Sequence, residues 1–112
     1  MAQEKKFQDY VKTYLKDNNC YIIVMHGDGL QRRGIPDIIC NYKNYFLGIE
    51  LKASNGHPSP LQIYNLRQIN KKGAYGILLY KSGFDKFVKF LSELPITHDL
   101  HNTYKDGYFI FK

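Results

Sequence analysis

The sequence predicts an α/β protein whose mixed sheet is covered by helices, in the order α-β-β-β-α-β followed by one more helix and a short strand. Three segments carry apolar residues at helical spacing, and between them lie short segments rich in β-branched and aromatic residues. Strands joined by short turns pair antiparallel, whereas a strand that follows a crossover helix pairs in parallel. The expected sheet is therefore mixed.

The first helix is expected over residues 3–17, where an apolar stripe repeats at i, i+3, i+4, i+7 and i+8. One step further back, the same stripe reaches Glu4, a carboxylate on the apolar face. An acid in a first helical turn is also stabilised by the helix dipole, so a functional and a structural interpretation of Glu4 weigh equally. The stripe consists of Phe7, Tyr10, Val11, Tyr14 and Leu15.

Three strands are expected next, at residues 20–25, 35–40 and 45–52, with a glycine-rich polar loop at 26–34. The third strand alternates, so that successive side chains point to opposite faces of the sheet. One face receives Tyr45, Leu47, Ile49 and Leu51, and the other receives Phe46, Gly48, Glu50 and Lys52.

The second helix is expected to begin after Ser59, a good N-cap followed by Pro60, and to end at Gly73. A fourth strand follows at 74–80 and a third helix runs from about residue 84 to Pro95. The last apolar run, 108–111, is expected to form a terminal hairpin or an edge strand.

Length and composition predict a single soluble domain over residues 1–112. Sixteen basic residues against ten acidic ones give a net charge of +6, which favours nucleic acid over an acidic protein surface as partner. No apolar run is long enough to cross a bilayer and no secretion signal is visible, so the expected location is the cytoplasm, that of the host cell if the protein is viral. Cys20 and Cys40 are expected to be reduced thiols that pack in or beside the sheet.

The hairpin of the second and third strands brings two acids together. If Lys43 and Asn44 form a two-residue loop, the register places Asp37 directly opposite Glu50, with Cβ atoms about 5 Å apart on one face. Lys52 projects from that face, about 7 Å further along the strand. A loop of odd length would separate the two acids.

Two carboxylates so close need a shared proton or a bound cation. With the lysine beside them, they suit phosphodiester hydrolysis: oxygen ligands hold Mg²⁺, and the lysine orients water or stabilises charge on the phosphoryl group. The competing interpretation, of about equal weight on these residues alone, is a salt bridge of Lys52 with Glu50 or Asp37 on a solvated sheet face.

Gln62 is a polar residue on the apolar face of the second helix, where it would face the same site. Its spacing from Ser59 also matches a capping box, in which the glutamine bonds back to the Ser59 N–H. Both roles can hold together.

Three short runs occur in order along the chain: RGIPDII at 33–39, GIELK at 48–52 and SPLQ at 59–62. Together with the order of the elements, these runs resemble the VRR-NUC nucleases of the PD-(D/E)XK superfamily, whose fold is that of restriction endonucleases. The resemblance runs from about residue 4 to residue 80 and is closest to small standalone members of the kind found in viruses and phages.

The resemblance implies a divalent metal site that uses Mg²⁺, with Mn²⁺ as a substitute. Lys52 would be the catalytic lysine, and Gln62 would line the site beside it. The implied catalytic residues are Asp37, Glu50, Lys52, Gln62 and Glu4, and the implied metal ligands are Asp37, Glu50, the Leu51 carbonyl and Glu4.

The resemblance also implies DNA as substrate, cut at branched or junction-like sites such as Holliday junctions, by a homodimer. The alternative is a non-catalytic nucleic-acid-binding module that keeps the fold, whose binding would be indifferent to chelators. A third possibility is a metal-free structural or interaction protein, which would not bind Mg²⁺.

Basic residues outside the hairpin are candidates for phosphate contacts. His26, Asp28, Arg32 and Arg33 lie in the loop that enters the second strand, where they could touch phosphates. A solvated loop explains the two arginines equally well, and it explains Asp28 better. His98 and His101 lack the neighbours that a zinc site needs and are expected at the surface. The other candidates for backbone contacts are Lys71, Lys72, Lys81, Lys86 and Lys89.

Overall fold

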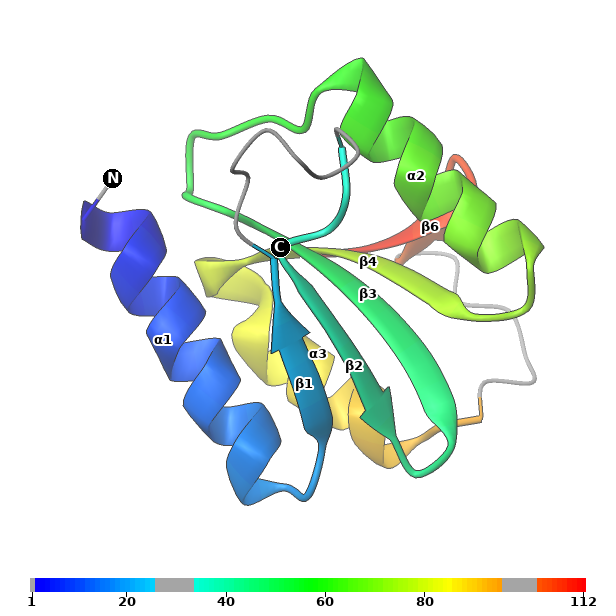
Figure 1. Ribbon diagram of the computed structural model, residues 1–112. Coiled ribbons are helices and arrows are strands. Elements are labelled where there is room, and N and C mark those ends of the chain that lie inside the picture. Colours follow the sequence, from blue (N-terminus) through cyan, green and yellow to red (C-terminus); the bar gives the residue numbers. More distant parts are fainter. Residues whose placement is uncertain (1, 26–33, 96–102) are drawn as a thin grey trace.

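The structure, a computed structural model, describes residues 2–25, 34–95 and 103–112 (Figure 1). Within these ranges the order of elements is the predicted one, with a short 3₁₀ turn before the third helix and a second short strand near the end. The elements are α1 (Ala2–Asp17), β1 (Tyr21–Val24), β2 (Ile38–Tyr42), β3 (Tyr45–Lys52), α2 (Pro60–Lys71), β4 (Tyr75–Tyr80), η1 (Lys81–Gly83), α3 (Phe84–Ser92), β5 (Tyr104–Lys105) and β6 (Tyr108–Phe111).

The sheet is mixed, as predicted, with the strand order β1-β2-β3-β4-β6-β5. β1, β2 and β3 are antiparallel neighbours, and β4, which follows the crossover helix α2, pairs in parallel with β3. β6 pairs in parallel with β4 and antiparallel with β5. The end of the chain is thus a hairpin, but β6 lies inside the sheet and β5 forms the edge.

The β2–β3 hairpin has the two-residue loop on which the acid pairing depends. Lys43 and Asn44 both have positive φ, 48° and 73°, as a type I′ turn requires. The ladder ends with the pair Ile38 and Ile49, and the same register extended by one residue puts Asp37 opposite Glu50. The predicted register of the hairpin is confirmed by the paired residues from Ile38 to Tyr42.

The second strand begins later than predicted, at Ile38, and runs on to Tyr42. Pro36 has no N–H to donate to a ladder, and Gly34 has a φ of 79°, which turns the chain before the strand starts. Asp37 still bonds to the segment that follows β1, because its carbonyl accepts a hydrogen bond from the Met25 N–H at 2.9 Å. The change leaves Asp37 at the entrance of β2 instead of inside it.

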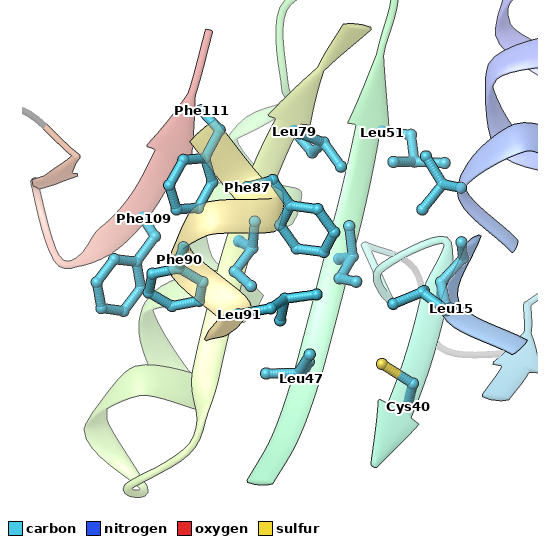
Figure 2. Close-up of a cluster of buried hydrophobic side chains, with 14 of the residues drawn as sticks. Leu15, Cys40, Leu47, Leu51, Leu79, Phe87, Phe90, Leu91, Phe109 and Phe111 are labelled. Atoms are coloured by element: carbon cyan, nitrogen blue, oxygen red, sulfur yellow. The ribbon is translucent and has the colours of Figure 1, made fainter. Parts of the chain in front are cut away.

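Helices cover both faces of the sheet (Figure 1). α1 and α3 share one face, where Val11, Leu15, Phe87 and Leu91 join the inward side chains of the strands in the main core (Figure 2). α2 lies on the other face, where its residue Leu66 is buried in a smaller apolar cluster with Leu78, Tyr80 and Tyr108. None of the helices in the described ranges is long and apolar enough to span a membrane.

One member of the predicted apolar stripe of α1 is not buried. Phe7, Val11 and Leu15 are in the core, but Tyr10 is 61% exposed and contacts Phe84 edge-on, with ring centroids 5.0 Å apart. The prediction that Tyr10 packs in the core or is half-buried is therefore wrong.

The two cysteines are free thiols, as expected. Cys40 is buried in the main core (Figure 2), and this burial raises its pKa to about 12, so the group is a neutral thiol at any physiological pH. Cys20 packs against the same cluster and is partly exposed. Both act as small apolar residues.

Candidate functional site

The predicted site residues meet where β3 ends. Asp37 stands at the entrance of β2, Glu50 and Lys52 are at the end of β3, and Gln62 is in the first turn of α2. Because β3 is flanked by β2 on one side and β4 on the other, Glu50 is enclosed on a sheet face that α2 covers. Four side chains from three segments of the chain therefore converge at one end of the sheet.

Asp37 is held by the backbone of β3. Its Oδ2 accepts the Leu51 N–H at 2.8 Å, which fixes the carboxylate over the strand that carries Glu50. In antiparallel pairing the N–H and C=O of one residue face the same neighbour, so the Leu51 carbonyl is directed to the side on which Asp37 lies. This is the backbone oxygen that the sequence resemblance implied as a metal ligand.

Glu50 is 2% exposed, an unusual position for a carboxylate. Its Oε2 accepts a hydrogen bond from Gln62 Nε2 at 2.8 Å and lies 3.5 Å from Lys52 Nζ. Its other oxygen, Oε1, is fully buried and has no hydrogen-bond partner. A buried acceptor without a partner is costly, so this oxygen is positioned for a group that supplies positive charge.

Burial is the largest cause that raises the pKa of both acids. Burial and then the charge of Asp37 raise the Glu50 pKa from its ordinary value of 4.5 to about 8, and Lys52 opposes that change. Burial also raises the Asp37 pKa, with Glu4 adding to the shift and the Leu51 N–H working against it. One lysine does not neutralise two carboxylates, so the pair favours either a proton or a further cation.

The salt-bridge interpretation is correct in part. Lys52 does pair with Glu50, but the two side chains are 18% and 2% exposed, so the pair does not lie on a solvated sheet face. A buried pair with a second carboxylate beside it is costly for stability. The arrangement is thus poorly explained by stabilisation of the fold.

Gln62 fills both roles that the sequence allowed. Its backbone N–H donates to Ser59 Oγ at 3.2 Å and its Oε1 accepts the Ser59 N–H at 2.8 Å, which is a complete capping box. Its Nε2 is left to donate to Glu50. The cap therefore fixes the amide that orients the buried carboxylate.

The donor set fits a hard divalent cation. Two carboxylates and a backbone carbonyl are oxygen ligands of the kind that Mg²⁺ prefers, and Glu50 Oε1 has no competing hydrogen bond. Across residues 2–25, 34–95 and 103–112, no group of three or more His, Cys, Asp or Glu side chains is placed to hold a metal. Glu4 thus lies near Asp37 without forming a three-acid cluster with the pair, and its role as a ligand stays a prediction.

A cleft with a volume of about 840 Å³ opens beside the acid pair, between α1, the segment after β3 and the start of α3. Glu4 and Lys52 lie in its wall together with Lys6 and Lys81. Lys81 was predicted as a candidate for backbone contacts but not at this site, and Lys6 and Tyr10 were not predicted to lie beside Lys52. No sequence signal places them here, because their approach depends on how α1 and α3 pack. The full lining is Glu4, Lys6, Phe7, Tyr10, Lys52, Ala53, Ser54, Lys81, Phe84 and Asp85.

The other predicted nucleic-acid contacts lie elsewhere. Lys71 and Lys72 are exposed at the far end of α2, about 15 Å along the helix from Gln62. They do not line the cleft. The predictions for His26, Asp28, Arg32, Arg33, His98 and His101 fall outside the described residues.

One solved structure described as a "VRR_NUC domain" is similar to this chain, with a TM-score of 0.64 and 22% sequence identity. The match covers 81% of this chain and 96% of that one. The chain has the fold of a VRR_NUC domain. This confirms the predicted restriction-endonuclease-like architecture. No family model and no curated protein matches the sequence.

Proposed function

We propose that this protein is a Mg²⁺-dependent nuclease that hydrolyses phosphodiester bonds of DNA. The observation that carries the proposal is the buried Glu50 with its unpartnered Oε1, next to Asp37 and paired with a single lysine. Such a group lowers the stability of the fold, and a cation at the pair relieves that cost. The fold shared with a VRR_NUC domain supports the nuclease class.

Asp37, Glu50 and the Leu51 carbonyl would hold the ion, which when bound polarises a phosphate and lowers the pKa of a coordinated water. The Leu51 N–H keeps the Asp37 carboxylate in place, and Gln62 does the same for Glu50. Lys52 Nζ, only partly exposed, donates to water or to a phosphoryl oxygen as negative charge develops there.

The cleft beside the pair suits the sugar–phosphate backbone. Lys6 and Lys81 flank Lys52 in its wall, and cations spaced along a cleft neutralise successive phosphates. We further propose that the substrate is branched or junction-like DNA, such as a Holliday junction, cut by a homodimer. These finer points rest on the resemblance of the sequence motifs to small VRR-NUC nucleases.

A panel of linear, flapped and four-way DNAs, incubated with Mg²⁺, Mn²⁺ or EDTA, tests the proposal. We expect cleavage with either metal, none with EDTA, and the highest rate on a branched DNA. Binding without cleavage in every metal would favour the non-catalytic binding module instead. Cleavage of all DNAs at the same rate would contradict the proposed preference for branched DNA but would still support the nuclease function.

The two roles of Gln62 separate by mutation. Ser59→Ala removes the cap but leaves Gln62 Nε2 free to bond Glu50, so it should lower the free energy of unfolding by about 1 kcal/mol and leave cleavage nearly unchanged. Gln62→Ala removes cap and contact together, so a similar loss of stability should accompany a roughly tenfold loss of rate. Urea unfolding and initial rates measure the two effects. Equal rates for the two variants would limit Gln62 to capping.

A further inference from the structure

Among the described residues, α2 covers only part of its face of the sheet. It packs on β3, β4 and β6, and beside it a groove with a volume of about 680 Å³ runs over the outer faces of β2 and β3. The groove is mainly apolar, and the two aromatic residues in its described lining, Phe46 and Tyr64, are 45% and 55% exposed. Its other apolar lining includes Ile35, Pro36, Ile39 and Leu61.

The exposed apolar surface continues beyond the groove onto β1. Ile23 pairs with Ile39 in the ladder, and Ile22, the residue before it, points into the main core. Ile23 and Tyr21 therefore point to the groove side, because side chains alternate along a strand. Both are exposed, so the sheet presents apolar and aromatic side chains from three adjacent strands on this face.

The groove begins next to the acid pair. Pro36 in its wall immediately precedes Asp37, and Leu61 in the opposite wall immediately precedes Gln62. A nucleic acid strand held by its phosphates at the acid pair can thus direct a neighbouring base toward the groove.

The charge in the groove favours a negatively charged partner. Among the described residues that line the groove, Lys72 is the one charged side chain and none is acidic. A second copy docked symmetrically on the groove would meet this lysine with no acid from the described lining to pair with it. A polyanion with apolar faces of its own meets both the charge and the aromatic side chains.

We propose that this groove binds unpaired bases of a nucleic acid strand, which stack on Tyr64 and Phe46 beside the site of cleavage. This proposal rests on the nuclease function proposed above, because it assigns the groove to the same substrate. Stacking on exposed aromatic side chains is tolerant of base identity and is available only to bases that are not paired. The groove would thereby favour DNA with a single-stranded segment at the cleavage site.

The test is binding of a fluorescent single strand of about 12 nucleotides and of the matching blunt duplex, measured by anisotropy in EDTA so that no cleavage intervenes. Tyr64→Leu and Phe46→Leu keep an apolar side chain but remove the ring. Each should weaken single-strand binding about tenfold and duplex binding less than about twofold. Tyr104→Leu, on β5 at the far edge of the sheet and 43% exposed, is the matched control and should leave both affinities unchanged.

In the wild type, photo-crosslinking should attach a DNA strand that carries 5-iodouracil to the peptide that contains Tyr64. Equal loss of single-strand and duplex binding would overturn the proposal, as would no loss at all. Loss of a dimer on size-exclusion chromatography, with single-strand affinity unchanged, would assign the face to a second copy instead. Binding is measured without metal, so the two proposals can fail separately. Wild-type protein that binds single strands through the groove but cleaves no DNA would refute the proposed nuclease function and leave the proposed binding of bases standing.

Discussion

Replacing Lys52 by Met should reduce the rate of DNA cleavage at least about 100-fold, the usual cost of removing one preorganised donor to a charged transition state. Lys52 Nζ lies 3.5 Å from Glu50 Oε2 and is the one cation paired with the acids in the described part of the chain. Methionine preserves much of the length and packing of the side chain. Divalent binding should persist, because both carboxylates remain.

Initial rates in Mg²⁺ measure this effect, with Lys16→Met, an exposed change in the last turn of α1, as the matched control. Asp37→Asn should lose the activity as well, but through loss of a proposed ligand. Thermal unfolding in Mg²⁺ shows whether each variant is folded. A folded Lys52→Met protein that cleaves at the wild-type rate would remove Lys52 from the mechanism.

Replacing Glu50 by Gln should stabilise the metal-free protein at pH 8 while abolishing cleavage. The Glu50 pKa is raised by burial from 4.5 to about 8, so the folded state binds a proton that the unfolded state has released. The contribution of protonated Glu50 to the free energy of unfolding is therefore fully present below pH 4.5, and it is lost as the pH rises through 8. Glutamine carries no charge to bury, and the expected gain at pH 8 is on the order of 2–4 kcal/mol.

Urea unfolding in EDTA at pH 5 and pH 8 measures that gain, which should be small at pH 5. Glu93→Gln, an exposed carboxyl at the end of α3, should change stability by less than about 0.5 kcal/mol at either pH. Mg²⁺ should stabilise the wild type more at pH 8 than at pH 5 and leave Glu50→Gln unaffected. A variant less stable than the wild type at pH 8 in EDTA would contradict a strained acid pair.

The acid pair was predictable because two short-range rules determine it. A two-residue turn sets the register of a hairpin, and the alternation of side chains then decides which residues share a face. Lys43 and Asn44 supply that turn, so Asp37 and Glu50 could be paired from the sequence alone. The capping box at Ser59 is equally local, which is why Gln62 could be assigned two roles.

The surroundings of the pair were not predictable in the same way. The cleft that gathers Lys6, Lys81 and Tyr10 depends on how α1 and α3 pack at one end of the sheet, and no local pattern encodes that packing. The groove along Tyr64 exists because α2 covers only part of its face. The early end of the regular ladder before Ile38 reflects Pro36 and the positive φ of Gly34, which the alternation pattern overlooked.

The most direct test of the central claim, that Asp37 and Glu50 together hold a divalent cation, is a titration of the protein with Mn²⁺ followed by electron paramagnetic resonance. The signal of free aqueous Mn²⁺ disappears when the ion is bound, so no DNA or cleavage is needed. The wild type should remove Mn²⁺ from solution, and the doubly substituted protein, Asp37→Asn with Glu50→Gln, should not. Identical titration curves for the two proteins would contradict the claim.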